Sequence, residues 1–95
     1  MLTIGRSIRK YRIALELAQR ELAEEAGISV PFLSQIENGH RDPSPAVLKR
    51  LASVLEVPIE LILLNAIDFS AVEDLTDAER RKLQQAQRIA EAYVA

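Results

Sequence analysis

Cysteine is absent from this 95-residue chain, and glycine and histidine are scarce. Without thiols there is no disulfide framework and no thiolate metal site, which fits a reducing compartment. The single histidine, His40, excludes a multi-histidine metal site. The three glycines are scattered and form no glycine-rich phosphate loop, and no serine lies in a nucleophile motif. We therefore predict that the protein is not an enzyme and uses no metal or cofactor.

Long apolar runs are absent as well. No stretch approaches the ~20 residues that a membrane-spanning helix needs. The amino terminus leads directly into a charged amphipathic pattern and lacks the apolar core of a signal peptide. The length suits one small domain with an appended helix. We expect a cytoplasmic protein that does not bind a membrane.

The net charge of −2 argues against a partner rich in phosphate, because nucleic-acid-binding domains usually carry a basic excess. The charges are unevenly distributed, however. Within residues 1–20 the only acid is Glu16 among several Arg and Lys residues, whereas residues 51–79 contain acids and neither Lys nor Arg. Such a chain can present a basic face to phosphates while its far side stays acidic.

Residues 18–38 contain two short helical patterns separated by Gly27, at a place where a sharp turn favours a positive φ. Ser29 is a natural N-cap for the second helix, and Pro31 falls in its first turn. Two helices joined this tightly leave the outer face of the second one free, as in helix-turn-helix proteins that enter the DNA major groove. The residues expected to face inward are Leu22, Ala23 and Ala26 in the first helix and Ile28, Leu33 and Ile36 in the second.

The remaining segments also have helical patterns, and none has the alternation of a strand. Ser44 caps a helix that begins at Pro45, and Thr76 opens a last helix with the capping box Thr76-Asp77-Ala78-Glu79. The expected helices outside the motif are 4–15, 45–55, 59–65 and 76–93. We predict an all-α fold of five compact helices over residues 1–65, a linker over 66–75, and an appended C-terminal helix within 76–95. That last helix would serve dimerisation or a partner.

One pattern within residues 8–63 is typical of a known family. Its residues are Gln19, Glu21-Leu22-Ala23, Ala26-Gly27-Ile28-Ser29, Leu33-Ser34-Gln35-Ile36-Glu37-Asn38-Gly39, Pro43-Ser44, Leu51-Ala52 and Leu55-Glu56-Val57. It resembles the helix-turn-helix domain shared by lambda-type phage repressors, Cro proteins and XRE-type bacterial regulators, with the motif at about 19–38. The resemblance implies a five-helix DNA-binding domain and a sequence-specific transcriptional regulator, expected to be a repressor that binds a palindromic double-stranded operator as a homodimer.

The resemblance also assigns roles to individual positions. It implies that Gln19 contacts the sugar-phosphate backbone and the recognition helix, and that the segment around His40 meets phosphates. Arg9 and His40 can equally be solvated surface residues, and Phe32 either contacts the groove or packs against the second helix. The expected DNA contacts are Arg9, Gln19, Arg20, Ser29, Val30, Pro31, Phe32, Ser34, Gln35, Asn38, His40 and Arg41.

The chemistry of the positions that face base edges favours a half-site rich in A·T pairs. Gln35 can pair bidentately with adenine, and Ser34 can serve several bases. Val30 and Pro31 offer only apolar contact with a thymine methyl group. No arginine on the recognition helix is placed for guanine, so part of the selectivity is expected to come from DNA shape.

Three further positions bear on the architecture. The resemblance implies that Arg12 and Glu37 form a buried pair that ties the first helix to the recognition helix; otherwise they are two independent solvated charges. Ala18 departs from the family, which often has Ser, Thr or Asn there, and the loss of that cap is expected to cost about 1 kcal/mol.

The fifth helix carries more apolar side chains than one helix face can bury in a small core. Either this surplus forms a two-fold dimer interface, or the sixth helix folds back and covers it. The expected interface residues are Leu61, Leu64, Ile67 and Phe69. A different class of function also remains open, namely an antitoxin-like or adapter module whose main partner is a protein and whose DNA contact is secondary.

Overall fold

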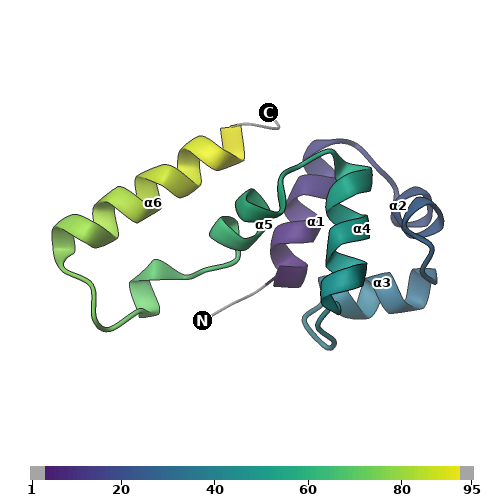
Figure 1. Cartoon of the computed structure of the whole chain (residues 1–95), viewed down its shortest axis with the longest axis horizontal. Helices are drawn as coiled ribbons and strands as arrows, with labels where there is room; N and C mark the ends of the chain where they lie inside the picture. The colour runs from purple at the N-terminus through teal and green to yellow at the C-terminus, as the bar shows by residue number, and fades with distance from the viewer. Residues whose placement is uncertain (1–3, 93–95) are drawn as a thin grey trace.

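The computed structural model describes residues 4–92, and every regular element in that range is a helix (Figure 1). The prediction of an all-α fold with an appended C-terminal helix is confirmed. The expected last residue of the final helix, Tyr93, lies outside the described range. The elements are α1 (Ile4–Ala14), α2 (Gln19–Ala26), α3 (Val30–Glu37), α4 (Pro45–Leu55), α5 (Ile59–Asn65), a short 3-10 helix η1 (Phe69–Ala71) and α6 (Asp77–Ala92).

Local sequence signals explain where α3 and α4 begin. The hydroxyl of Ser29 accepts a hydrogen bond from the Phe32 amide at 3.1 Å, and the hydroxyl of Ser44 accepts one from the Val47 amide at 3.2 Å. Gly27 ends α2 in the left-handed region with φ of 72°, as a turn between two crossing helices requires. Gly27 and Ser29 thus form the turn between α2 and α3, and Ser44 fixes the start of α4.

The start of α2 has no capping side chain, because Ala18 has no polar group to offer. Instead, the carboxylate of Glu21 reaches back and accepts a hydrogen bond from the Ala18 amide at 3.2 Å. This contact is one half of a capping box, and it satisfies a backbone donor that would otherwise lack a partner at the start of the helix.

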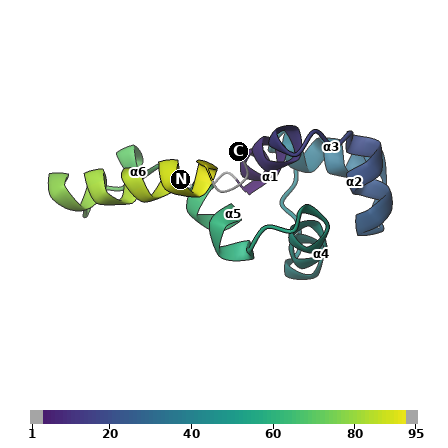
Figure 2. The same cartoon turned by 90° about the horizontal axis from the view of Figure 1, so that it is seen from above.

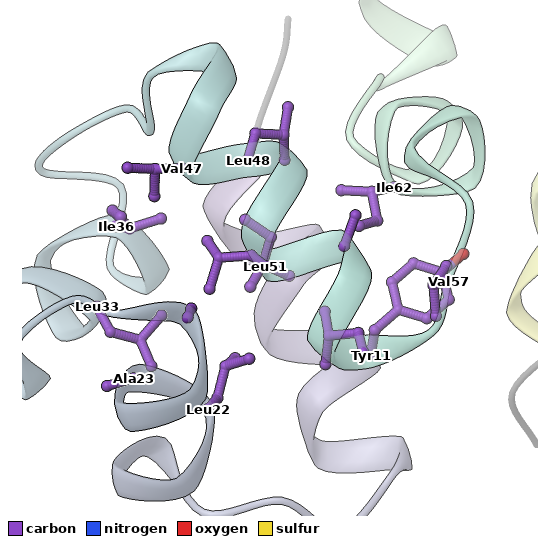
Figure 3. Close-up of a cluster of buried hydrophobic side chains, with 14 residues drawn as sticks. Tyr11, Leu22, Ala23, Leu33, Ile36, Val47, Leu48, Leu51, Val57 and Ile62 are labelled. Atoms are coloured by element: carbon purple, nitrogen blue, oxygen red, sulfur yellow. The ribbon is translucent and has the colours of Figure 1, made fainter.

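One apolar core joins the first five helices (Figure 3). Leu51 of α4 lies in the middle of the cluster in Figure 3, between Leu22 and Leu33 of the motif on one side and Ile62 of α5 on the other. The largest fully buried apolar side chains of this core are Ile8, Tyr11, Leu22, Leu33, Ile36, Leu51 and Ile62. Because α2 and α3 contribute to the same core as α1 and α4, the motif is a rigid part of the domain.

The contact between α1 and α3 is unusually close at Gly5. A Cβ atom at this position would overlap the carbonyl group of Ile36, which lies at the carboxyl end of α3. A glycine is therefore needed on α1 at this point, and the lack of a side chain lets the two backbones touch.

The α5 helix is tied to α1 through its backbone. The buried Ser7 hydroxyl donates to the Ile62 carbonyl at 2.7 Å, and the Tyr11 hydroxyl donates to the Leu61 carbonyl at 3.4 Å. These bonds pair polar groups that would be costly to bury alone. They leave the opposite side of α5 available to other elements.

The α6 helix packs on α5 and η1, on the far side of the molecule from α2 and α3 (Figures 1 and 2). Gln87 donates to the carbonyls of Leu64 and Ile67, at 2.8 and 2.5 Å, and Arg80 donates to the carbonyl of Phe69. The segment expected as a linker thus contains η1, with Phe69 buried. Within the described part of the chain, the helices are too short or too polar to serve as membrane spans.

Candidate nucleic-acid interface

The α3 helix has one face in the core and one face toward solvent. Leu33, Ile36 and Glu37 are buried. On the other face Val30, Pro31, Gln35 and Asn38 are exposed and Ser34 is half-buried. This division follows from the helical repeat, because the inward positions recur three and four residues apart. The side chains expected to face base edges therefore share one accessible surface.

A buried carboxylate fixes the carboxyl end of α3. Glu37 accepts hydrogen bonds from Arg12 Nε at 2.7 Å, from a terminal nitrogen of Arg12 at 3.0 Å, and from the Gln19 amide at 2.9 Å. Arg12 also donates to the Leu17 carbonyl at 2.8 Å. The side chains of Glu37 and Arg12 are only 1% and 13% exposed.

This network joins three helices at one point. Arg12 comes from α1, Gln19 is the first residue of α2, and Glu37 is the last residue of α3. The bidentate fork of an arginine fixes both the distance and the plane of its carboxylate partner. The orientation of α3 relative to α1 and α2 is thus set by directional bonds as well as by apolar packing.

Two groups of polar side chains lie beside the exposed face of α3. On α1, Arg6, Arg9 and Lys10 line a surface hollow together with Asn38 at the end of α3. After α3, the exposed His40 and Arg41 lie in the turn that leads to α4. Positive charge next to a polar helix face is typical of surfaces that bind phosphate.

The other expected contact residues have more varied surroundings. The Ser29 hydroxyl caps α3. Arg20 is exposed and pairs with Glu24 one turn later, at 3.3 Å. Phe32 is half-buried against the core, and the guanidinium of Arg41 lies 5.0 Å from the centre of its ring. Both residues are among the expected DNA contacts, and the structure places the Arg41 guanidinium over the Phe32 ring.

The residues expected at a dimer interface lie on α5 and in the segment after it. Leu61, Leu64 and Ile67 are half-buried, and Phe69 is buried in η1. The α6 helix covers part of this surface through its bonds from Gln87. The sixth helix therefore covers some of the surplus apolar side chains and leaves others partly exposed.

Sequence reasoning missed one residue that supports the motif. Arg50 of α4 donates from Nε to the carbonyl of Ala26, the last residue of α2, at 2.9 Å. This bond satisfies a carbonyl at the end of α2, next to the turn of the motif. Arg50 lies on the exposed side of α4, so helical periodicity gives no signal that would separate it from a solvated arginine.

Metal binding has no support in the described range. Among residues 4–92, no three His, Asp or Glu side chains come together in a group that could hold a metal ion.

The sequence of this domain matches that of known proteins. Residues 8–62 match the sequence model of a family described as helix-turn-helix. An uncharacterized HTH-type transcriptional regulator of Mycobacterium tuberculosis is 43% identical over 62 residues, which are 65% of this chain and 44% of the relative. Two Bacillus subtilis proteins align over 67 residues, which are 70% of this chain. The uncharacterized HTH-type transcriptional regulator RghRB is 43% identical (48% of its length), and the HTH-type transcriptional repressor RghR is 37% identical (50% of its length).

These alignments span about half the length of each relative or less. The rest of each relative has no counterpart in the aligned part of this chain.

Replacement of Arg12 by alanine should destabilise the protein strongly, because the buried carboxylate of Glu37 would lose its charged partner. We expect a loss of about 3–5 kcal/mol in the free energy of unfolding, measured by urea denaturation. Arg20→Ala is the matched control, since Arg20 also pairs with a glutamate but its side chain is 83% exposed. Its loss should stay near or below about 0.5 kcal/mol. Equal losses in the two variants would contradict the role given to the network.

Proposed function

The chain belongs to the XRE-type helix-turn-helix family, and on that premise we propose that it is a sequence-specific transcriptional regulator that binds double-stranded DNA. In this proposal it acts in the cytoplasm as a repressor, and a homodimer occupies a palindromic operator. The observation that carries the proposal is the exposed polar face of α3, whose opposite face is anchored by the Glu37 network. A helix held in this way can enter the major groove without losing its position in the domain.

The side chains on the exposed face would read the bases. Gln35 offers an amide that can pair with N6 and N7 of adenine, and Ser34 can donate or accept. Val30 and Pro31 can contact a thymine methyl group. The expected half-site is therefore rich in A·T pairs, with a further contribution from sequence-dependent DNA shape.

Phosphate contacts would come from both ends of this surface. Arg9 and its neighbours Arg6 and Lys10 surround the hollow beside Asn38, and His40 and Arg41 follow α3. Contacts of this kind position a protein on the duplex but carry no sequence information. The acidic segment at residues 51–79 begins in α4 and ends in the first turn of α6, so most of it lies away from α3 and would face away from the DNA.

The surface of α5 and α6 supports the homodimer. Leu64 and Ile67 stay half-exposed after α6 has packed, and Ile89 of α6 is 66% exposed. Partly exposed apolar side chains on two adjacent helices favour an interface with a second copy. A two-fold dimer can present two α3 helices to half-sites about 34–36 Å apart on one side of the DNA. Occupation of a promoter by such a dimer would block RNA polymerase.

Loss of the polar groups on α3 should weaken binding and reduce its selectivity. After selection of an operator from random duplexes, we expect Gln35→Ala to weaken binding about tenfold and to relax the preference at one base pair, since one bidentate pair is worth about 1–3 kcal/mol. Ser34→Ala should have a smaller effect of the same kind. The measurement is a gel-shift titration of each variant on the selected and on scrambled duplexes.

Ser53→Ala on α4 is the matched control, because this side chain is exposed and lies outside the motif. It should bind as the wild type does. Unchanged affinity and selectivity in the folded Ser34 and Gln35 variants would contradict the proposed recognition face. Binding of DNA only after a partner protein is added would favour an adapter role instead.

If the protein is a homodimer, one substitution at the interface should lower its mass in solution. The chain of 10.6 kDa should sediment at about twice that mass at high micromolar concentration. The Leu64→Glu variant should sediment as a monomer, because an unpaired charge is costly to bury in the interface. Ile13→Glu on α1 is the control, since Ile13 is also a partly exposed apolar residue but lies beside the end of α3. A wild-type protein that sediments only as a monomer would refute the proposal.

A further inference from the structure

The contact between Phe32 and Arg41 joins the recognition helix to the turn that follows it. The guanidinium carbon of Arg41 lies 5.0 Å from the centre of the Phe32 ring, within the range of a cation–π contact. Phe32 is the third residue of α3 and packs on the core with part of its ring. The other part remains accessible and serves as a platform for Arg41.

Hydrogen bonds hold the backbone of Arg41, in addition to the contact of its guanidinium with Phe32. Gly39 adopts φ of 78° and reverses the chain, and the amides of His40 and Arg41 both donate to the Gln35 carbonyl, at 2.9 and 3.2 Å. An arginine held at its backbone and stacked at its guanidinium has few rotamers left to lose on binding. The cost of ordering this side chain against a ligand is therefore small.

The edge of the stacked guanidinium is available for a ligand. A cation–π contact with the ring is not a hydrogen bond to a carbonyl or carboxylate, so the N–H donors of the group can still bind another acceptor. Within residues 4–92 the Arg41 side chain makes no hydrogen bond and no ion pair, although the exposed Asp42 is its neighbour in sequence. A planar fork of free donors fits a phosphate, which can accept two parallel hydrogen bonds.

The position of Phe32 on α3 indicates a ligand at the edge of the groove. Phe32 lies one turn before the buried Ile36 and thus on the flank of the helix, between the core and the face that carries Ser34 and Gln35. The edges of base pairs lie in front of that exposed face, whereas the phosphates line the sides of the groove. A side chain held at the flank therefore points to the strand backbone.

We propose that Phe32 and Arg41 act as one unit, in which the ring holds the guanidinium for bidentate contact with a DNA phosphate beside the recognition helix. This inference rests on the proposed function and assigns the two residues different roles. Arg41 touches the DNA, and Phe32 is a positioning residue that acts through Arg41. Neither residue then determines which base is preferred.

A double-mutant cycle tests the coupling, with Phe32→Leu, Arg41→Ala and the double variant titrated on the selected operator and on scrambled duplex at several salt concentrations. Arg41→Ala should weaken binding about tenfold on both duplexes and reduce the salt slope by about 0.9, as expected for one lost phosphate contact. Phe32→Leu should weaken binding about threefold in the wild-type background and have no effect in the Arg41→Ala background. Melting temperatures of all variants establish that each is folded.

Two conservative variants separate stacking from size and charge. Phe32→Tyr keeps the ring face and should bind as the wild type does, and Arg41→Lys keeps the charge but loses the planar fork and should fall between the wild type and Arg41→Ala. Arg81→Ala on the exposed part of α6 is the control for the salt slope and should leave it unchanged.

Three outcomes would overturn the inference while wild-type binding is intact. These are additive losses in the cycle, an Arg41→Ala variant with normal affinity, and a changed base preference in the Arg41 variants, which would indicate a guanine contact instead. A wild-type protein that binds no duplex at all would refute the proposed function itself.

Discussion

The buried carboxylate of Glu37 is the constraint on which the recognition surface depends. A carboxylate removed from water must be paired, and here Arg12 and Gln19 donate three hydrogen bonds to it from two other helices. The same end of α3 is held by the close approach of Gly5 to the Ile36 carbonyl. Directional bonds and steric contact thus agree on one orientation for α3. A helix that reads base edges requires such rigidity, because small displacements break bidentate contacts.

The molecule divides its chemistry between its two ends. One end presents the exposed face of α3, flanked by cations on α1 and in the turn after α3, whereas the end with α5, η1 and α6 carries partly exposed leucines and isoleucines. The α5 helix connects them, since Ser7 binds its backbone from α1 and Gln87 binds its last turn from α6. An interface formed at the end with α5 and α6 would therefore be connected to α3 through helices that share one apolar core.

The sequence was sufficient for the helices and for the division of α3 into two faces, because these depend on local rules. Gly27, Ser29 and Ser44 mark turns and caps by their own chemistry, and the spacing of Leu33 and Ile36 defines the buried face. The substitute cap at Ala18 was also readable in principle, since Glu21 lies three residues later. The resemblance also implied the contacts of Arg12 and Gln19 with α3, but the other contacts between distant segments were not readable. The bond from Arg50 to Ala26, the bonds from Gln87 to α5 and the stack of Arg41 on Phe32 all depend on how the helices and the turn after α3 are placed.

The most direct test of the account is to map the protein surface that touches DNA. Backbone amide shifts in ¹⁵N-correlated spectra, recorded during titration with the selected duplex, report each residue separately. We predict that the largest changes occur at Val30, Ser34 and Gln35, with smaller changes in the turn at His40 and Arg41 and on α1 at Arg9. Changes concentrated on α5 and α6, with α3 unaffected, would contradict it.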